Sequence, residues 1–302
     1  MAGCVTKITL QAQRMPALNT TGIKRISVMP FEYTDSFCQS AAQYATTVAA
    51  SKIQAANHFT LVSPLIINDA RKKGEGIENY VDALFTGQII LITHNTKSLQ
   101  RSYKDRNGNT ITYVTYRREV EVDMSYSLVH AGDGILIGPV IKKGRSGSSG
   151  RDDSSGLESV NALVNSAIDS LLKLLNQDVA PYTIRINRSL ADEPNQELKT
   201  QSDAALAHVK SGNYIAALQV YRAIWESSNS IAAAVNASIL YEAMGETRNA
   251  ADFMQQVLAA TGSPTARDTL ALLNKELEEQ AGVEQFADDQ IQGHSSKFPM
   301  RP

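Results

Sequence analysis

Cysteine is scarce in this sequence, and its scarcity excludes two kinds of structure. Only Cys4 and Cys38 occur among 302 residues, and neither belongs to a CxxC pair or to a cysteine–histidine cluster. Because a disulfide framework or a zinc site needs such groupings, neither is expected. The five histidines show no ligand spacing such as HxxxH, so no metal site is predicted.

Long apolar runs and a strong net charge are also missing. A membrane-spanning helix needs about 20 consecutive apolar residues, whereas the longest run here, Ile89–Ile92 with Leu84 and Phe85 before it, has the length of a strand. The formal net charge of −2 gives no general attraction to nucleic acid. With 43% hydrophobic and 20% charged residues, the composition is typical of globular protein, and the length favours two domains.

Motifs of catalysis are absent as well. Gly144, Gly147 and Gly150 lie between an expected strand and an expected helix, where phosphate loops occur, but they form neither GxGxxG nor GxxxxGK[ST]. No serine stands in a GxSxG elbow. Cys38 falls on the buried-looking part of an expected helix, which is typical of a packing cysteine. We therefore predict a protein that is not an enzyme and binds no cofactor.

The chain begins with Met1-Ala2-Gly3-Cys4, which resembles the end of a bacterial lipobox. In a lipobox, small residues precede a cysteine that becomes the lipidated N-terminus, so the pattern predicts lipidation at Cys4. The alternative is an accidental cysteine near a start codon. The segment after Cys4 is rich in Gln, Asn and Thr and has little periodicity, so residues 1–23 are expected to be a lipobox-like start and a tether.

Residues 24–190 mix strand and helix patterns and predict an α/β domain. Apolar runs of strand length alternate with longer stretches of helical spacing, and the segment at 82–92 is continuously apolar, as in a strand covered on both faces. The expected elements are a strand at 24–31, a helix at 36–55, a short strand at 58–63, a short helix at 65–73 that ends at Gly74, and a central strand at 82–92.

The second half of this domain contains a hairpin. Asn107-Gly108 is the strongest short hairpin signal, and the return strand alternates apolar and polar residues from Glu119 to Leu128. The Gly- and Ser-rich stretch 144–156 predicts a mobile loop. An amphipathic stripe predicts a helix over 157–175, and a strand at 182–190 closes the domain.

The C-terminal part is helical in period and repeats itself. Gly212 and Gly245 are separated by 33 residues and occupy equivalent positions in two units, which predicts stacked helical hairpins over 191–280. The pattern resembles tetratricopeptide repeats, in which small residues allow close helix packing and the concave face binds a polypeptide; the alternative is a helical cap on the first domain. The residues singled out for this role are Ala205, His208, Gly212, Tyr214, Tyr221, Tyr241 and Gly245. Residues 281–302 are expected to be a flexible tail.

Several short sequence segments within residues 24–190 resemble the corresponding segments of one known family. They are Ile26-Ser27-Val28-Met29-Pro30-Phe31, Phe59-Thr60-Leu61-Val62, Asp82-Ala83-Leu84-Phe85-Thr86-Gly87 and Ser127-Leu128-Val129. The family contains the curli-secretion lipoprotein CsgG, the penicillin-binding-protein activator LpoB and the N-terminal domain of TolB. The resemblance implies a periplasmic lipoprotein that docks or assembles rather than catalyses.

Basic residues gather around the expected hairpin and form a possible rim, with Tyr103, Tyr113 and Tyr116 nearby. Tyrosine and arginine are common at binding hot spots, although a solvated hairpin is the alternative. The residues of this rim are Arg101, Lys104, Arg106, Arg117 and Arg118. More basic residues, between Lys142 and Arg151, could extend it.

Together these patterns predict an α+β fold, a mixed sheet with packed helices, followed by all-α tetratricopeptide-like hairpins. The function predicted is protein binding or assembly in the bacterial cell envelope, on the periplasmic side, with an N-terminal lipid in the outer membrane. Protein partners, and a possible homo-oligomer, are expected. The alternative is an oligomeric secretion or transport component of the curli-secretion type.

Overall fold

The computed structural model describes residues 6–292, with side chains for residues 6–289. The chain divides into two compact units: an α/β unit, Pro16–Ala180, and a helical unit that joins the residues before Pro16 to Pro181–Asp288. The α+β fold class and the all-helical C-terminal region are confirmed. Among the described residues, no helix combines the length and the apolar character needed to cross a membrane.

The α/β unit is built on a six-stranded mixed sheet. Its strands run in the order β4-β2-β5-β6-β7, and β3 also pairs with β5. The pairs β2–β4, β2–β5 and β3–β5 are parallel, whereas β5–β6 and β6–β7 are antiparallel. The strands are β2 (Arg25–Val28), β3 (Glu32–Tyr33), β4 (Thr60–Leu61), β5 (Ala83–Lys104), β6 (Thr110–His130) and β7 (Leu136–Arg151).

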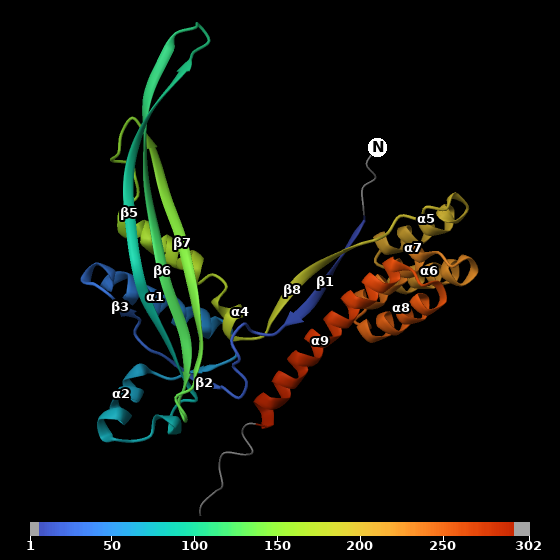
Figure 1. Cartoon of the computed structure of the whole chain (residues 1–302), viewed down its shortest axis with the longest axis horizontal. Coiled ribbons are helices and arrows are strands. Elements are labelled where there is room, and N and C mark those ends of the chain that lie inside the picture. Colours follow the sequence, from blue (N-terminus) through green and yellow to red (C-terminus); the bar gives the residue numbers. More distant parts are fainter. Residues whose placement is uncertain (1–5, 293–302) are drawn as a thin grey trace, which may run out of the picture. The chain divides into compact units, whose positions relative to one another are not determined.

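Helices pack on both faces of this sheet. One face is covered by α1, α3 and α4, and the end of the other face carries α2 (Figure 1). Leu84 and Phe85, adjacent on β5, belong to the two different apolar clusters, which explains why the sequence is continuously apolar there. The helices are η1 (Ser36–Cys38), α1 (Gln39–Ala55), α2 (Pro64–Lys73), η2 (Ile77–Asn79), α3 (Val160–Leu171) and α4 (Leu175–Val179).

The local signals of the first half are confirmed. Gly74 ends α2 in the left-handed conformation, with φ of 70°. The alternating segment of β6 buries its apolar side chains against α1 and α3, and its polar ones lie on the opposite face. The buried residues are Val120, Val122, Met124, Tyr126 and Leu128.

The prediction of a mobile loop at 144–156 is wrong for most of its length. Residues 144–151 continue β7 and pair with β6 as far as Arg151↔Thr115. Gly144 serves close packing rather than mobility, because a Cβ there would lie 2.7 Å from Leu171 Cγ on α3. This small residue therefore lets a helix cross the strand closely.

The helical unit begins with a two-stranded antiparallel sheet, β1 (Lys7–Arg14) and β8 (Tyr182–Ser189), in the register Lys7↔Ser189. The structure differs here from the expected tether, because alternate residues of β1, including Ile8 and Leu10, are buried against the helices. The closing strand expected at 182–190 exists, but it pairs with β1 and not with the main sheet.

In the described part of the chain, five helices follow β8. They are α5 (Gln196–Lys210), α6 (Tyr214–Ser228), α7 (Ile231–Ala243), α8 (Thr247–Thr261) and α9 (Pro264–Gln292). Gly212 and Gly245 end α5 and α7 with φ of 77° and 81°, so the 33-residue offset marks two equivalent turns. The helix α9 extends through the first part of the segment for which a flexible tail is expected.

Buried ion pairs fasten the β1–β8 sheet to the helices α7 and α9. The Arg188 guanidinium donates to both carboxylate oxygens of Glu242 at 2.8 and 2.7 Å, and Arg14 Nη2 lies 2.8 Å from Glu276 Oε1. The side chain of Asn236 on α7 also bonds both backbone groups of Ala191. The sheet is thus an integral part of the helical unit.

Candidate protein-binding surface

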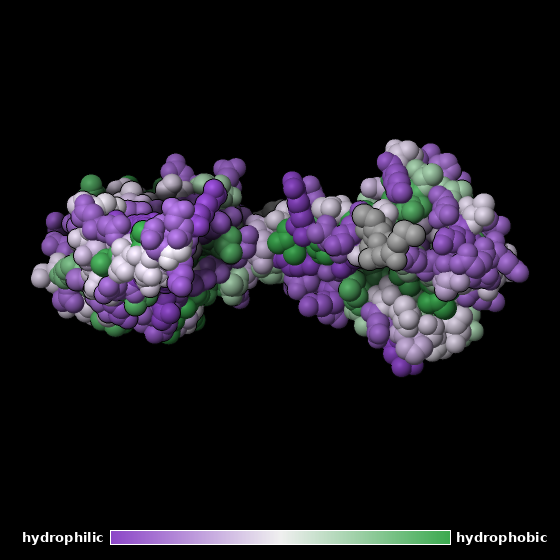
Figure 2. Space-filling view, turned by 90° about the horizontal axis from the view of Figure 1, so that it is seen from above, coloured by the Kyte–Doolittle hydropathy of each residue, from purple (hydrophilic) through white to green (hydrophobic). Residues whose placement is uncertain are grey.

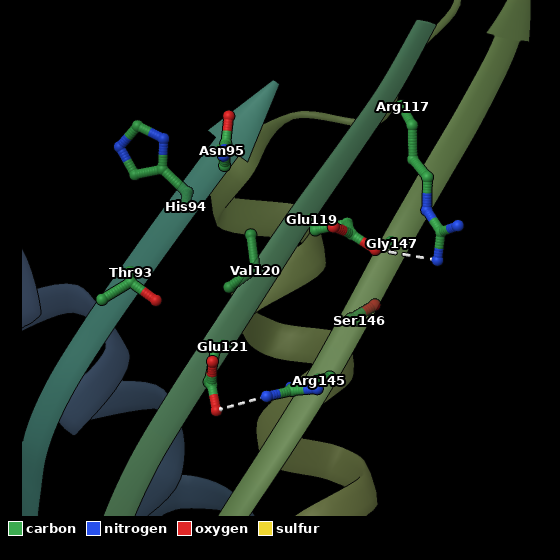
Figure 3. Close-up of a pocket in the computed structure, with 10 residues that line it drawn as sticks. All are labelled: Thr93, His94, Asn95, Arg117, Glu119, Val120, Glu121, Arg145, Ser146 and Gly147. Atoms are coloured by element: carbon green, nitrogen blue, oxygen red, sulfur yellow. Dashed lines mark hydrogen bonds and ion pairs between the residues drawn. The ribbon is translucent and has the colours of Figure 1, made fainter. Parts of the chain in front are cut away.

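One face of β5, β6 and β7 points away from α1 and α3. Around residues 93–95, 117–123 and 143–147 this face is open and carries a row of charged side chains. An open groove of about 720 Å³ lies along it (Figure 3). Its lining residues are Thr93, His94, Asn95, Arg117, Glu119, Val120, Glu121, Arg145, Ser146 and Gly147. The groove is therefore lined by polar and charged side chains.

Cross-strand pairing organises these charges. Arg145 Nη2 lies 3.1 Å from Glu121 Oε1, and Lys143 Nζ lies 2.7 Å from Asp123 Oδ2. The hydrogen bond and charge of Asp123 raise the pKa of Lys143, so this ammonium group stays protonated. The acids on β6 are thus matched by cations on β7, one strand further out.

Beyond β7, β5 and β6 continue as a two-stranded ribbon, residues 100–114, which we call the projecting ribbon (Figure 1). Its turn is fixed by Asp105, whose Oδ1 accepts from the backbone N–H groups of Asn107 and Asn109 at 2.8 Å. The hydrogen bonds from Asn109 come first among those that lower the pKa of Asp105. Gly108 completes the turn with φ of 83°, which confirms the Asn-Gly hairpin signal.

The two faces of the projecting ribbon differ in chemistry. Arg101 pairs with Tyr113, and Tyr103 pairs with Ile111, on one face. The Tyr103 and Tyr113 ring centroids are 6.0 Å apart, and the Arg151 guanidinium carbon lies 4.1 Å from the Tyr113 centroid. The other face carries Gln100, Ser102, Thr110 and Thr112, together with Lys104 and Val114. One face thus has the aromatic and arginine composition of a binding hot spot.

The predicted basic rim separates into two groups. Arg117 forms an exposed ion pair with Glu119 of the same strand at 2.8 Å, and Arg118 donates to Thr96 Oγ1 and to the Glu158 carbonyl, so both guanidinium groups are engaged within the chain. Arg101, Lys104 and Arg106 are exposed on the ribbon and have no hydrogen bond or ion pair with another described residue. Within the rim, only these three have charges that the described part of the chain leaves for a partner.

The residues predicted to bind through the helical hairpins have mainly structural positions. Ala205 and Tyr221 are 0% and 1% exposed and hold the helices together, so they cannot contact a partner. Tyr241 packs on Phe253 and accepts from Arg222 at 3.3 Å. Gly212 and Gly245 form the turns. His208 and Tyr214 remain partly exposed.

The side chains that could support catalysis or metal binding are dispersed. Cys38 is 1% exposed in the main core, as its position on the expected helix indicated, and burial raises the pKa of its thiol. The His94 ring lies against Phe37, with centroids 5.8 Å apart. Within residues 6–289, no three His, Cys, Asp or Glu side chains form a group that could hold a metal ion. Cys4 lies outside the described residues.

Sequence reasoning misses the cationic partners on β7, because the composition of residues 144–156 predicts a loop there. A signal is nevertheless available: the acids at 119, 121 and 123 alternate along β6, and Lys143 and Arg145 alternate after the turn at 131–134 with matching spacing. Opposite charges at mirrored positions of a hairpin predict cross-strand pairs.

No family model matches the chain, and no curated protein matches its sequence. Several solved structures are weakly similar to this chain. The PelC dodecamer from Paraburkholderia phytofirmans is 16% identical with a TM-score of 0.27, over 57% of this chain and 98% of that one. Lipoprotein GNA1162 from Neisseria meningitidis is 12% identical with a TM-score of 0.28, over 50% and 97%.

The rare lipoprotein B from Shewanella oneidensis is a third such structure, with 12% identity and a TM-score of 0.23 over 50% of this chain and 93% of that one. Two of the three proteins are named as lipoproteins. TM-scores this low carry no conclusion about function, so the function has to be inferred from the contacts and charges of this chain.

Proposed function

We propose that this protein is a non-catalytic binding or assembly factor of the bacterial envelope, anchored by a lipid at Cys4, that docks a partner protein through the projecting ribbon. The observation that carries the proposal is the amphipathic character of residues 100–114. A two-stranded ribbon is only marginally stable in water, and this one presents Tyr103 and Ile111, 49% and 36% exposed, on a single face.

The chemistry of that face favours a protein partner. Arginine and tyrosine are enriched at protein interfaces, because each combines a broad contact area with hydrogen-bonding groups. The ribbon, residues 100–114, carries three cations, Arg101, Lys104 and Arg106, and one acid, Asp105, and this acid is used by the turn. The partner surface is therefore expected to be acidic. A strand facing lipid would not place Arg101 beside Tyr103, which disfavours the secretion-channel alternative.

The helices are proposed as a second, tetratricopeptide-like binding module, with one restriction. The β1–β8 sheet lies on α7 and α9, so a polypeptide could use only helix surfaces turned away from that sheet. Truncation at Pro194 would not test this module cleanly, because it would uncover the apolar side of β1, including Ile8 and Leu10.

Face-specific crosslinking in the full chain tests the role of the ribbon. A photo-crosslinking amino acid is placed at Tyr103, on the aromatic face, or at Thr112, on the polar face. In envelope extract of the bacterium that encodes the chain, we expect one discrete adduct from position 103 and none from position 112. The substitutions Arg101→Glu and Arg106→Glu should abolish the adduct. Equal labelling from both faces, or an adduct that survives charge reversal, would refute the proposal.

A further inference from the structure

We infer that the free edge of β7 accepts an extended, acidic segment of a partner polypeptide as an additional strand. This edge, residues 141–150, is a different surface from the projecting ribbon, so the inference goes beyond the proposed function. In the sheet, β7 is the last strand, and no strand among the described residues pairs with its outer side (Figure 1).

Backbone geometry defines which groups this edge offers. The Asp152 N–H donates to the Val114 carbonyl at 2.7 Å. Because hydrogen-bonded and open positions alternate in an antiparallel pair, residues 146, 148 and 150 direct their N–H and C=O groups toward β6. Arg145, Gly147 and Ser149 direct theirs outward, and all three are exposed. An incoming strand would find a regular row of donors and acceptors.

The edge lacks the protection that such strands usually have. Natural edge strands are blocked by prolines, bulges or unpaired charges. In β7, the bulge and Pro139 lie near the N-terminal end of the strand. The stretch from 144 to 150 contains only Gly and Ser besides Arg145. The ion pairs to Glu121 and Asp123 draw Arg145 and Lys143 back over the sheet. Residues 144–150 of this edge are therefore open to strand pairing.

Charge decides what kind of segment fits. The strand β7 carries four cations and no acid. Lys143 and Arg145 are paired on their β6 side only, and their side chains are 67% and 81% exposed. Acids at alternate positions of an added strand would face these cations from the other side and complete an acid–cation–acid row across three strands.

The same charges disfavour some pairings with a second copy of this chain as the added strand. Antiparallel pairing of two β7 edges centred on Gly147 would put Lys143 opposite Arg151. Pairing centred on Arg145 would put this residue opposite itself. Like charges directly opposite each other destabilise a pair of strands. Both arrangements are thus unfavourable, whereas an acidic segment meets neither difficulty.

A peptide with the sequence of Glu119–Ser125 is a suitable probe, since this sequence already faces Lys143 and Arg145 from β6. The full chain is titrated with this peptide and with a control peptide that has lysine at the three acidic positions. We expect the acidic peptide alone to bind and to slow amide hydrogen exchange at Arg145, Gly147 and Ser149. Exchange at Ser146 and Ser148, whose N–H groups already point to β6, should stay unchanged.

Two variants make the test specific. The double substitution Lys143→Glu and Arg145→Glu should weaken the acidic peptide by about tenfold and confer binding of the lysine peptide. Ser149→Pro should abolish binding because it removes an outward N–H, while Ser149→Ala, which keeps this N–H, serves as the control. A chain without residues 101–113 should bind normally, which separates this inference from the role of the ribbon.

Three results would overturn the inference. The first is absence of both binding and exchange protection with the acidic peptide. The second is equal binding of the two peptides, since charge would then select nothing. The third is protection of the same three amides by concentration-dependent self-association of the chain without peptide, because a second copy would then occupy the edge.

Discussion

At the scale of single residues, Gly144 shows how a small side chain sets the distance between a strand and a helix. An added Cβ would lie 2.7 Å from Leu171 Cγ. We therefore expect Gly144→Ala to lower the free energy of unfolding by about 1–3 kcal/mol, the usual cost of overpacking. Urea denaturation of the full chain measures this change.

Two further variants distinguish a steric cause from a general effect of replacing glycine. Gly156 has nothing within 4 Å of an added Cβ, so Gly156→Ala should leave the stability unchanged. Adding Leu171→Ala to Gly144→Ala should cost less than the sum of the two single changes, because the clash is removed. Strict additivity of the two changes would contradict this account.

Asp82 is expected to make the free energy of unfolding depend on pH. Burial raises the pKa of Asp82. Hydrogen bonds from the Arg25 guanidinium and from the backbone N–H groups of Arg25 and Lys24 lower this pKa by a larger amount, so the net shift is downward. A carboxyl group with a lowered folded-state pKa stabilises the fold above its unfolded pKa, about 3.9 for Asp. This stabilisation is lost as the pH falls through the folded pKa.

The substitution Asp82→Asn tests this argument. It should reduce the free energy of unfolding by about 1.5–3 kcal/mol near neutral pH, since hydrogen bonds to a charged acceptor are lost. The difference from the parent chain should shrink as the pH approaches about 3. Denaturation across this pH range measures it, with Asp69→Asn, at an exposed ion pair with Lys73, as the control. A pH-independent difference would contradict the argument.

At the scale of elements, the projecting ribbon adds surface without adding core. No residue between 100 and 114 is buried, and Gln100 pairs with Val114 across its base. Replacing residues 101–113 with Asn-Gly should therefore change the free energy of unfolding by less than about 0.5 kcal/mol. Thermal denaturation followed by circular dichroism measures this. A large loss of stability would mean that the ribbon supports the sheet.

Elements with a single dominant local signal are predictable from the sequence, and elements defined by a distant partner are not. The Asn107-Gly108 turn and the alternation of β6 follow from turn chemistry and period alone. β1 resembles a tether in sequence, because its partner β8 begins 168 residues after the end of β1 (182 − 14). Residues 144–151 of β7 resemble a loop in sequence, because the reason for the glycine at 144 is close packing against Leu171, which is distant in the chain.

The candidate surface is predictable to a similar degree. The arginines and tyrosines of the hairpin are recognised by composition, but their division between exposed and structural roles depends on partners far along the chain. Arg118, for example, is held by the Glu158 carbonyl. Likewise, Ala205 and Tyr221 match a repeat pattern whose purpose is packing, so the pattern identifies the fold of the hairpins and not a contact surface.

At the scale of the whole molecule, the α/β unit is an insertion between the two strands of the β1–β8 sheet. The last pair of that sheet is Arg14↔Tyr182, and only Met15 and Pro181 separate this pair from the inserted unit. Replacing residues 15–181 with Asn-Gly would turn β1 and β8 into an ordinary hairpin. We expect the shortened chain to fold, with cooperative thermal unfolding and the helical circular dichroism of α5–α9. A molten or aggregated product would show that the inserted unit is needed.

This nested arrangement sets an order for synthesis on the ribosome. The strand β1 emerges first but has no partner until β8 emerges, after the whole α/β unit has been made. During that interval Ile8 and Leu10, which end up buried, are exposed to solvent. A chaperone that shields the N-terminal segment would therefore act on this protein until β8 is available to pair with β1.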